Sequence, residues 1–148
     1  MAIPDPPPPL IGALLRMPLD AVHRVMIEAL HARGFTDVTP AHLPVLRWPG
    51  PDGRRPVELA AQVGMTKQAM NYLLGQLETL GYLERRVDPD DVRSRRVHLT
   101  GRGRDIPGVI RGAIGELERD WESRMGSGDW RRLKELLLEL NTAAAERP

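Results

Sequence analysis

The sequence predicts a mainly α-helical fold with one small β-hairpin, and three observations lead to this fold class. Apolar residues recur at three- and four-residue steps through most of the 148 residues. One stretch, residues 82–99, instead alternates apolar and polar residues around a turn-forming centre. The chain has no cysteine, and its 41% apolar and 28% charged residues are ordinary for a globular domain. We therefore expect a folded core without disulfides or thiol chemistry.

The first helix is expected to begin at Leu10, after a proline-rich arm. Residues 1–9 contain five prolines and are expected to be disordered or polyproline-like. The helical period then continues, but Pro18 interrupts it, so we expect a break or kink there. Gly34 is expected to end this helix.

Three shorter helices follow. Thr39 and Pro40 supply an N-cap and a first helical residue for a helix that stops before Trp48-Pro49, and residues 49–55 form a tight loop. A helix from Pro56 is closed by Gly64, and a longer one is capped by Thr66 and closed by Gly81. The longer helix turns this stripe inward: Met70, Leu73, Leu74, Leu77 and Leu80. Two helices joined by a Gly64-Met65-Thr66 turn predict a helix-turn-helix.

A β-hairpin with a charged tip is expected directly afterwards, in residues 82–99. Residues 82–87 and 95–99 are its alternating flanks, and the Asp88-Pro89-Asp90-Asp91 segment is its turn. A helix-turn-helix followed at once by such a hairpin, or wing, predicts a winged helix-turn-helix.

Two further helices are expected at the C-terminus. Thr100 is expected to cap a helix of about five turns that reaches Met125, and a last helix follows Gly126-Ser127-Gly128. Together with the first helix, these expose more apolar surface than one small domain can cover, which predicts a symmetric homodimer. The expected organisation is an arm at 1–9, a dimerisation region at 10–36 and 103–148, and a winged helix-turn-helix at 37–102.

Charge is distributed unevenly along the chain. The net charge of +1 separates into −1 for residues 1–53, +4 for residues 54–104 and −2 for residues 105–148. A basic middle segment indicates an anionic partner, although a solvated charged face gives the same pattern.

The start of the helix at Thr66 has the composition of a DNA-recognition helix. Its outward residues are expected to be Thr66, Lys67, Gln68, Asn71 and Tyr72. Gln and Asn can bond adenine edges, Lys can reach guanine or phosphate, and the free N–H groups suit a phosphate oxygen. The alternative is that these are ordinary surface residues.

The hairpin is rich in arginine, the residue that narrow minor grooves attract. Seven arginines lie between Arg85 and Arg104. The wing residues expected to contact DNA are Asp91, Arg93, Arg95 and Arg96, with Asp91 orienting the Arg93 side chain. The alternative is a solvated hairpin whose charges protect strand edges.

No other chemistry is indicated. The four histidines, His23, His31, His42 and His98, lack metal-ligand spacing, so no metal site is expected. Catalytic and nucleotide-binding motifs are absent, and Asp90-Asp91 lies on a turn where nothing would desolvate it, so we expect neither an enzyme nor a cofactor. Without a secretion signal or an apolar span, the chain is expected to be cytoplasmic and not membrane-bound.

Residues 38–103 resemble the MarR family of winged-helix transcription factors of bacteria and archaea. The resemblance rests on Thr39-Pro40-Ala41-His42-Leu43, on Glu58-Leu59-Ala60 and on Gly64-Met65-Thr66-Lys67-Gln68. It continues in residues 77–85 and is most specific in the wing, at Asp88-Pro89-Asp90-Asp91-Val92-Arg93 and Val97-His98-Leu99-Thr100 with Gly103. Pro18, Pro44 and the proline-rich arm depart from the family pattern.

The resemblance implies a homodimer that binds a pseudo-palindromic operator on double-stranded DNA, usually as a repressor. It also implies a small aromatic or amphipathic effector, for which His23, Met26, His31 and Trp48 are candidate lining residues, or alternatively plain core or interface residues. A different class of function stays open: a winged helix that contacts other proteins and does not bind specific DNA.

Overall fold

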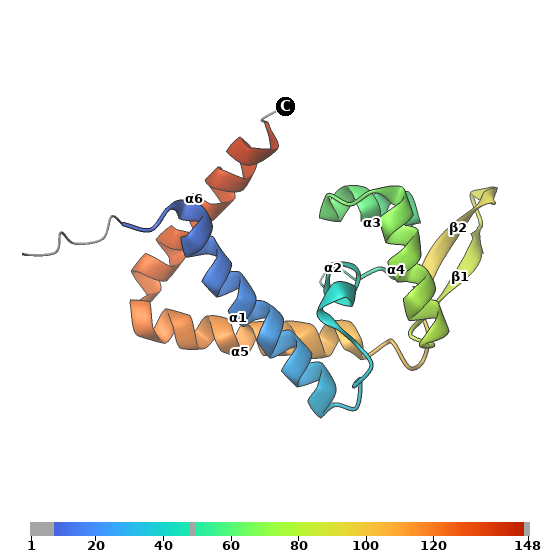
Figure 1. The fold of residues 1–148 in the computed structure, drawn as a ribbon, viewed down its shortest axis with the longest axis horizontal. Coiled ribbons are helices and arrows are strands. Elements are labelled where there is room, and N and C mark those ends of the chain that lie inside the picture. Colours follow the sequence, from blue (N-terminus) through green and yellow to red (C-terminus); the bar gives the residue numbers. More distant parts are fainter. Residues whose placement is uncertain (1–7, 48–49, 147–148) are drawn as a thin grey trace, which may run out of the picture. The chain divides into compact units, whose positions relative to one another are not determined.

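In the computed structural model, which describes residues 8–47 and 50–146, the chain is mainly helical with one hairpin (Figure 1). The elements follow in this order: α1 (Ile11–Ala32), the short 3-10 helix η1 (Pro40–His42), α2 (Leu43–Leu46), α3 (Pro56–Val63), α4 (Lys67–Thr79), β1 (Leu83–Asp88), β2 (Asp91–Leu99), α5 (Ile106–Met125) and α6 (Ser127–Ala145). The predicted fold class is confirmed, because each expected helix and the hairpin are present. Of the predicted arm, only Pro8 and Pro9 lie within the described residues.

The chain divides into two compact units, residues 1–113 and residues 114–148. Helix α5 crosses this boundary, so its first turns belong to the winged-helix unit and its remainder to the C-terminal unit. The predicted boundary at residue 103, between the winged helix-turn-helix and the dimerisation region, stays a prediction.

Helix α1 runs through Pro18 without interruption, so no break occurs there, and the alternative, a kink, stays a prediction. Proline removes one backbone N–H donor, which leaves the carbonyl of Leu14 without its usual helical partner. Leu14 is 53% exposed, so water can solvate that carbonyl. Gly34, with φ of 89°, lies just past the helix end as predicted, and the Phe35 N–H donates back to the Leu30 carbonyl at 3.0 Å.

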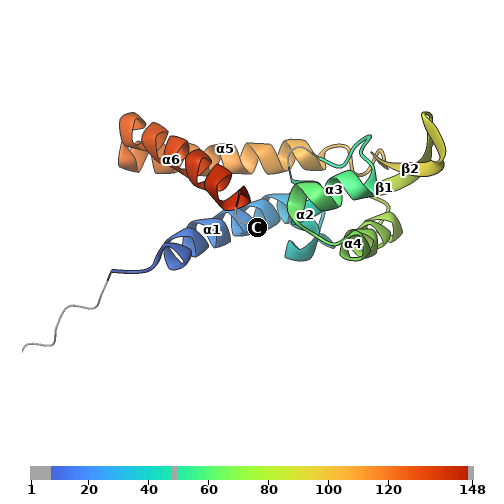
Figure 2. The ribbon, with the colours of Figure 1, turned by 90° about the horizontal axis from the view of Figure 1, so that it is seen from above.

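The helix-turn-helix consists of α3 and α4 (Figure 2). Gly64 ends α3 in the left-handed conformation, with φ of 67°, where a residue with a side chain would be strained. Thr66 Oγ1 then accepts the Ala69 N–H at 3.1 Å, which confirms it as the N-cap of α4. Four residues of the predicted stripe are buried, namely Met70, Leu73, Leu74 and Leu77.

Strands β1 and β2 pair antiparallel in the register Leu83↔Leu99 to Val87↔Arg95. A feature that the sequence did not predict extends this hairpin: Arg54 forms an isolated bridge with Val97. The Gly53 N–H donates to the Val97 carbonyl, and the Val97 N–H donates to the Arg54 carbonyl at 2.8 Å. The loop before α3 is thereby attached to the wing.

Thr100 does not cap the next helix, contrary to the sequence prediction. Its hydroxyl donates to the Gly81 carbonyl at 2.6 Å and accepts the Gly103 N–H at 3.2 Å, and α5 begins only at Ile106. Thr100 therefore closes the turn that leaves β2.

The core of the first unit gathers side chains from nearly all its elements. Fully or almost fully buried residues include Leu30, Leu46, Leu74, Leu77, Tyr82, Val97, Ile106 and Ile110. Because α4 contributes one whole face to this core, its opposite face is left to solvent.

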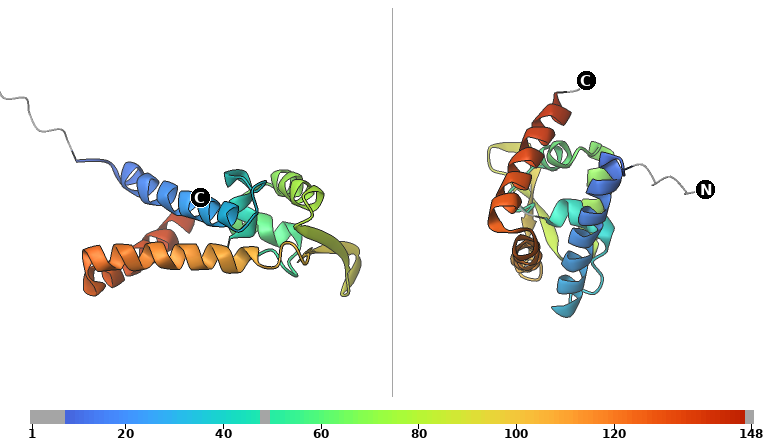
Figure 3. Two further views of the ribbon diagram at one scale, coloured as in Figure 1. Left: turned by 90° about the horizontal axis from the view of Figure 1, so that it is seen from below. Right: turned by 90° about the vertical axis from the view of Figure 1, so that its left-hand side faces the viewer.

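In the C-terminal unit, the end of α5 contacts α6 (Figure 3). The Trp121 and Trp130 rings meet edge to face with centroids 6.0 Å apart, and Lys134 Nζ lies 2.8 Å from Glu118 Oε2. No described residue of α6 is buried, and Leu136, Leu138 and Leu140 are 45%, 67% and 42% exposed.

Candidate nucleic-acid interface

The first turn of α4 presents an exposed polar end. Thr66, Lys67 and Gln68 are all exposed, and Tyr72, one turn further along, is 68% exposed. The first backbone N–H groups of a helix have no partner within it, so this end also offers donors to an anion. Four of the five residues expected to face outward do so.

Asn71, the fifth, is half-buried and engaged with the wing. Its Oδ1 accepts from Arg85 Nη1 at 2.9 Å, and its Nδ2 donates to the Lys67 carbonyl at 3.0 Å. Arg85 also forms an ion pair with Glu78, with Nε 3.0 Å from Oε2. Asn71 therefore helps to join α4 to β1, and any contact it makes with a ligand must compete with these bonds.

The tip of the wing is organised by Asp91. Its Oδ1 accepts the backbone N–H of Arg93 at 3.0 Å, and its Oδ2 accepts from the Ser94 hydroxyl at 2.7 Å. The Ser94 and Arg93 hydrogen bonds lower the pKa of Asp91. Asp91 thus shapes the backbone of the tip, where the sequence analysis expected it to orient the Arg93 guanidinium.

Next to the turn of the wing, at the end of β1, lies a buried ion cluster centred on Asp88. This carboxylate is 0% exposed and pairs with Arg55, with Nε 2.6 Å from Oδ2, and with Arg96, with Nε 3.0 Å from Oδ1. Burial on its own raises the pKa of Asp88, but the Asp90 backbone N–H and the two guanidinium groups outweigh it and lower the pKa to about 2.

Arg96 belongs to this cluster. It also pairs with Asp90, with Nη2 3.0 Å from Oδ2, and donates to the Gly53 carbonyl at 3.2 Å. The sequence analysis grouped it with the DNA-contacting arginines, but the structure places it between the wing and the loop before α3.

The wing arginines therefore divide into two kinds. Arg85, Arg86, Arg96 and Arg102 each pair with a carboxylate. Within the part of the chain that the structure describes, Arg93 and Arg95 pair with none; Arg95 donates to the Ser94 carbonyl at 3.1 Å. The sequence pattern could not separate these kinds, because pairing depends on which acid lies across the hairpin.

A cleft of about 250 Å³ joins the start of α4 to the unpaired wing arginines. It is lined by Arg55, Pro56, Val57, Lys67, Asn71, Arg93, Ser94 and Arg95. Cationic side chains from α3, α4 and β2 thus border one opening. Arg55 is the member that the sequence analysis missed, because nothing in the sequence shows that the N-cap of α3 faces the wing.

The four candidate effector residues do not gather in one described cleft. His23 lines a cleft of about 450 Å³ with Asp20, Arg24, Ile27, Glu28 and Pro40. Met26 is 2% exposed in the core, and His31 Nε2 lies 2.9 Å from the Val38 carbonyl oxygen. Trp48 lies outside the described residues.

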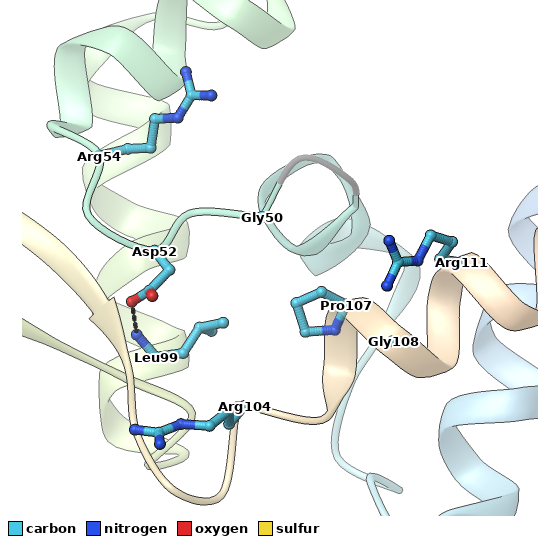
Figure 4. Close-up of a pocket in the computed structure, with 8 residues that line it drawn as sticks. All are labelled: Gly50, Asp52, Arg54, Leu99, Arg104, Pro107, Gly108 and Arg111. Carbon is cyan, nitrogen blue, oxygen red and sulfur yellow. Dashed lines mark hydrogen bonds between the residues drawn. The ribbon is translucent and has the colours of Figure 1, made fainter.

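Another cleft, of about 500 Å³, lies between the loop before α3, the end of β2 and the start of α5 (Figure 4). Its lining residues are Gly50, Asp52, Arg54, Leu99, Arg104, Pro107, Gly108 and Arg111. The Arg111 side chain turns toward Pro107, whereas the side chains of Arg54 and Arg104 extend away from Pro107 (Figure 4). The three guanidinium groups therefore do not converge on one ligand position.

A polar cluster connects the wing base to the segment after α1. The Tyr82 hydroxyl donates to Asp37 Oδ1, Arg102 Nη2 lies 2.9 Å from Asp37 Oδ2, and the Arg102 guanidinium lies 4.5 Å from the centre of the Tyr82 ring. Burial and the Asp37 contact raise the pKa of Tyr82. This Asp37–Tyr82–Arg102 cluster ties together three segments far apart in sequence.

The described residues form neither a metal-binding cluster nor a membrane-spanning helix. In residues 8–47 and 50–146, no group of three or more His, Cys, Asp or Glu side chains is placed to hold a metal ion. No helix of these same segments combines the length and the apolar content that crossing a bilayer requires.

Comparisons with known proteins relate this fold and interface to one family. Residues 36–94 match the sequence model of the MarR family. No protein of curated function matches the sequence significantly. Among solved structures, a MarR family transcription regulator is 25% identical, with 92% of this chain and 86% of that chain covered and a TM-score of 0.74.

Two more solved structures share this fold. Wild-type MarR from E. coli, in its apo form, is 25% identical, with 90% of this chain and 98% of that chain covered and a TM-score of 0.66. The transcriptional repressor CouR, solved bound to a 23-mer DNA duplex, is 24% identical, with 93% of each chain covered and a TM-score of 0.66.

Proposed function

We propose that this chain, which resembles the MarR family in sequence over residues 36–94 and has the fold of its solved regulators, is a sequence-specific DNA-binding transcriptional regulator. One observation carries the proposal. Lys67 at the start of α4 and the unpaired Arg93 and Arg95 of the wing border the same cleft. A recognition helix in the major groove and a wing in the minor groove need cations on these two elements.

The exposure and the hydrogen bonds of these residues support a different role for each. Thr66, Lys67 and Gln68 stand at the exposed helix start, where side chains reach base edges and backbone donors reach phosphate. Arg93 and Arg95 supply the minor-groove contact, and Asp91 shapes the tip that presents them. Asn71 and Arg96 support the interface, because Asn71 already binds Arg85 of β1 and Arg96 already binds Asp88 at the end of β1. Nothing in this arrangement requires catalysis or a cofactor.

The finer regulatory role extends the same proposal. The protein acts as a homodimer on a pseudo-palindromic operator and represses by occupying it, with recognition helices about 34–36 Å apart. The likeness in fold to CouR, which was solved bound to a 23-mer DNA duplex, supports binding to duplex DNA. Such a regulator works in the cytoplasm of a bacterial cell, where the chromosome lies. A small amphipathic effector releases it, and His23, Met26, His31 and Trp48 remain candidate contacts.

The first test is fluorescence anisotropy of the full chain on the DNA upstream of its own gene, against scrambled DNA, at two salt concentrations. A regulator prefers the upstream fragment by about 10³-fold or more, with affinity that falls steeply with salt. Equal and weak binding to both fragments contradicts the proposal and favours a winged helix that contacts other proteins.

The wing contribution is tested with Arg93→Ala. Removing one phosphate or groove contact weakens binding to every sequence and reduces the salt slope by about one per wing. The matched control is Arg33→Ala, which removes the same charge from an exposed position after α1. If Arg93→Ala binds with the same affinity and slope as Arg33→Ala, the wing does not contact DNA.

A further inference from the structure

A line of hydrogen bonds runs from the exposed face of α4 to a buried histidine. The Tyr72 hydroxyl, on a side chain that is 68% exposed, lies 3.1 Å from Gln76 Nε2. Gln76 Oε1 lies 3.3 Å from His42 Nε2, and His42 is only 5% exposed. His42 Nδ1 in turn accepts the backbone N–H of Thr39 at 3.2 Å. Four residues from η1 and α4 are thus joined in series.

The direction of every bond in this line follows from its buried end. A backbone N–H can only donate, so His42 Nδ1 must be the unprotonated nitrogen and Nε2 must carry the proton. Nε2 then donates to Gln76, which fixes the amide with its oxygen toward His42 and its NH₂ group toward Tyr72. The Tyr72 oxygen accepts from that NH₂ group, so its own proton points away from Gln76.

We infer that His42 and Gln76 are positioning residues that make the Tyr72 hydroxyl a one-way hydrogen-bond donor toward DNA. The inference rests on the proposed function. Tyr72 lies one turn beyond Gln68 on the exposed face of α4, where it faces the same partner. A donor there favours an acceptor, such as guanine O6, thymine O4 or a phosphate oxygen, over the amino groups of adenine and cytosine.

This series of hydrogen bonds satisfies both ring nitrogens of buried His42 and orients the hydroxyl of exposed Tyr72. A buried histidine needs partners on both ring nitrogens, because a lost hydrogen bond in the interior costs free energy. Thr39 and Gln76 supply these two partners from different elements. Without the bond from Gln76, the exposed Tyr72 hydroxyl could rotate its proton toward or away from the helix. It would then no longer favour hydrogen-bond acceptors on the DNA.

The decisive variant is Gln76→Glu, which keeps the shape of the side chain and reverses the bond. A carboxylate cannot donate, so the Tyr72 hydroxyl turns its proton inward and presents only lone pairs to the DNA. Thr79→Glu is the matched charge control, because Thr79 is exposed on the same helix, three residues further on. Circular dichroism and thermal melting establish that each variant is folded.

Affinities for the preferred DNA are then compared by anisotropy in two backgrounds. We expect Tyr72→Phe to weaken binding by about five- to tenfold, the size of one hydrogen bond. When Tyr72 is present, Gln76→Glu should weaken DNA binding about five- to tenfold more than Thr79→Glu does. When Tyr72 is replaced by Phe, Gln76→Glu and Thr79→Glu should weaken DNA binding equally. The inference is overturned if Tyr72→Phe binds like the native chain, or if Gln76→Glu has equal effects in both backgrounds.

A second measurement needs no DNA and separates this inference from the proposed function. The ¹⁵N shifts of the His42 ring in the full chain at neutral pH report which nitrogen carries the proton. The Nε2–H tautomer is expected, whereas an Nδ1–H or doubly protonated ring overturns the inference. Failure of the native chain to prefer any DNA contradicts the proposed function instead, and the ring measurement is unaffected by that result.

Discussion

Asp88 shows how a single residue sets the geometry of the wing. It is the last residue of β1, and its buried carboxylate binds one arginine from the N-cap of α3 and one from β2. Removing one partner of a buried ion pair leaves an uncompensated charge, which is strongly destabilising. Asp88 therefore joins the wing to the start of α3, in addition to the bridge between Arg54 and Val97.

This carboxylate predicts a specific acid sensitivity. Its pKa is about 2 in the folded chain against an ordinary value of 3.8, so the stabilisation is complete above about pH 5. It is lost as the pH falls toward 2, because the unfolded state then binds the proton more readily. Asp88→Asn should lower the melting temperature at neutral pH and flatten its decline between pH 4 and 2.

The measurement is thermal unfolding by circular dichroism over this pH range. Asp129→Asn, an exposed change at the start of α6, is the control and should leave the profile almost unaltered. A profile for Asp88→Asn that is parallel to the native one would show that the ion cluster does not contribute.

At this scale the sequence predicted which residues of α4 are exposed better than it predicted the partners of the polar side chains. The helical period and the cap at Thr66 were enough to place Lys67, Gln68 and Tyr72 on the exposed face of α4. Neither could show that Asn71 binds Arg85, or that Arg96 binds Asp88, because those partners come from other elements. His42 illustrates the same limit, since its link to Gln76 spans 34 residues.

At the scale of the elements, the turn between β2 and α5 leaves no room for a side chain at Gly103. A Cβ atom added to Gly103 would lie 1.9 Å from the Tyr82 carbonyl oxygen, which belongs to the backbone and cannot move aside. That carbonyl also accepts the Thr100 N–H at 3.1 Å. Any side chain at Gly103 must therefore push the turn away from the wing.

We predict that Gly103→Ala destabilises the fold by about 2–3 kcal/mol, the usual cost of forcing atoms into a filled space. Urea denaturation followed by fluorescence measures the change. Gly101→Ala is the matched control, because a Cβ there meets no atom within 4 Å. Equal stability of the two variants would contradict the close contact.

The elements themselves were predictable where local rules decide. Apolar spacing, the Thr66 cap, the glycine at position 64 and the turn chemistry of residues 88–91 all led to the observed structure. The rules failed where solvent or tertiary contacts compensate. Pro18 lies within an exposed part of α1, where water can reach the carbonyl of Leu14, and the Thr100 hydroxyl bonds the Gly81 carbonyl instead of capping α5. The bridge from Arg54 to Val97 is a single pair and has no periodicity to detect.

For the whole molecule, the outstanding feature is uncovered apolar surface. Residues 11–20 of α1 are all exposed, including Ile11 at 60%, Leu14 at 53% and Leu19 at 50%. Helix α6 adds Leu138 at 67%. Folded monomers rarely leave so many large apolar side chains in water, which supports the proposed homodimer.

The dimer prediction is tested by sedimentation equilibrium. The native chain is expected at twice the 16.5 kDa of one protomer, and Leu14→Glu should weaken association by at least about a hundredfold, because it buries a charge in the interface. Val92→Glu is the control, since Val92 is 75% exposed at the wing tip. A native chain that sediments at the mass of one protomer contradicts the homodimer.

The Asp37–Tyr82–Arg102 cluster has a consequence for the order of folding. Asp37 is 45 residues from Tyr82 and 65 from Arg102, so the cluster can close only after the intervening chain has become compact. Helices and the hairpin form from neighbours in sequence, and contacts across long loops are slower. We therefore expect the cluster to form late in folding, after α4 and the wing, and to fix the segment after α1 against them.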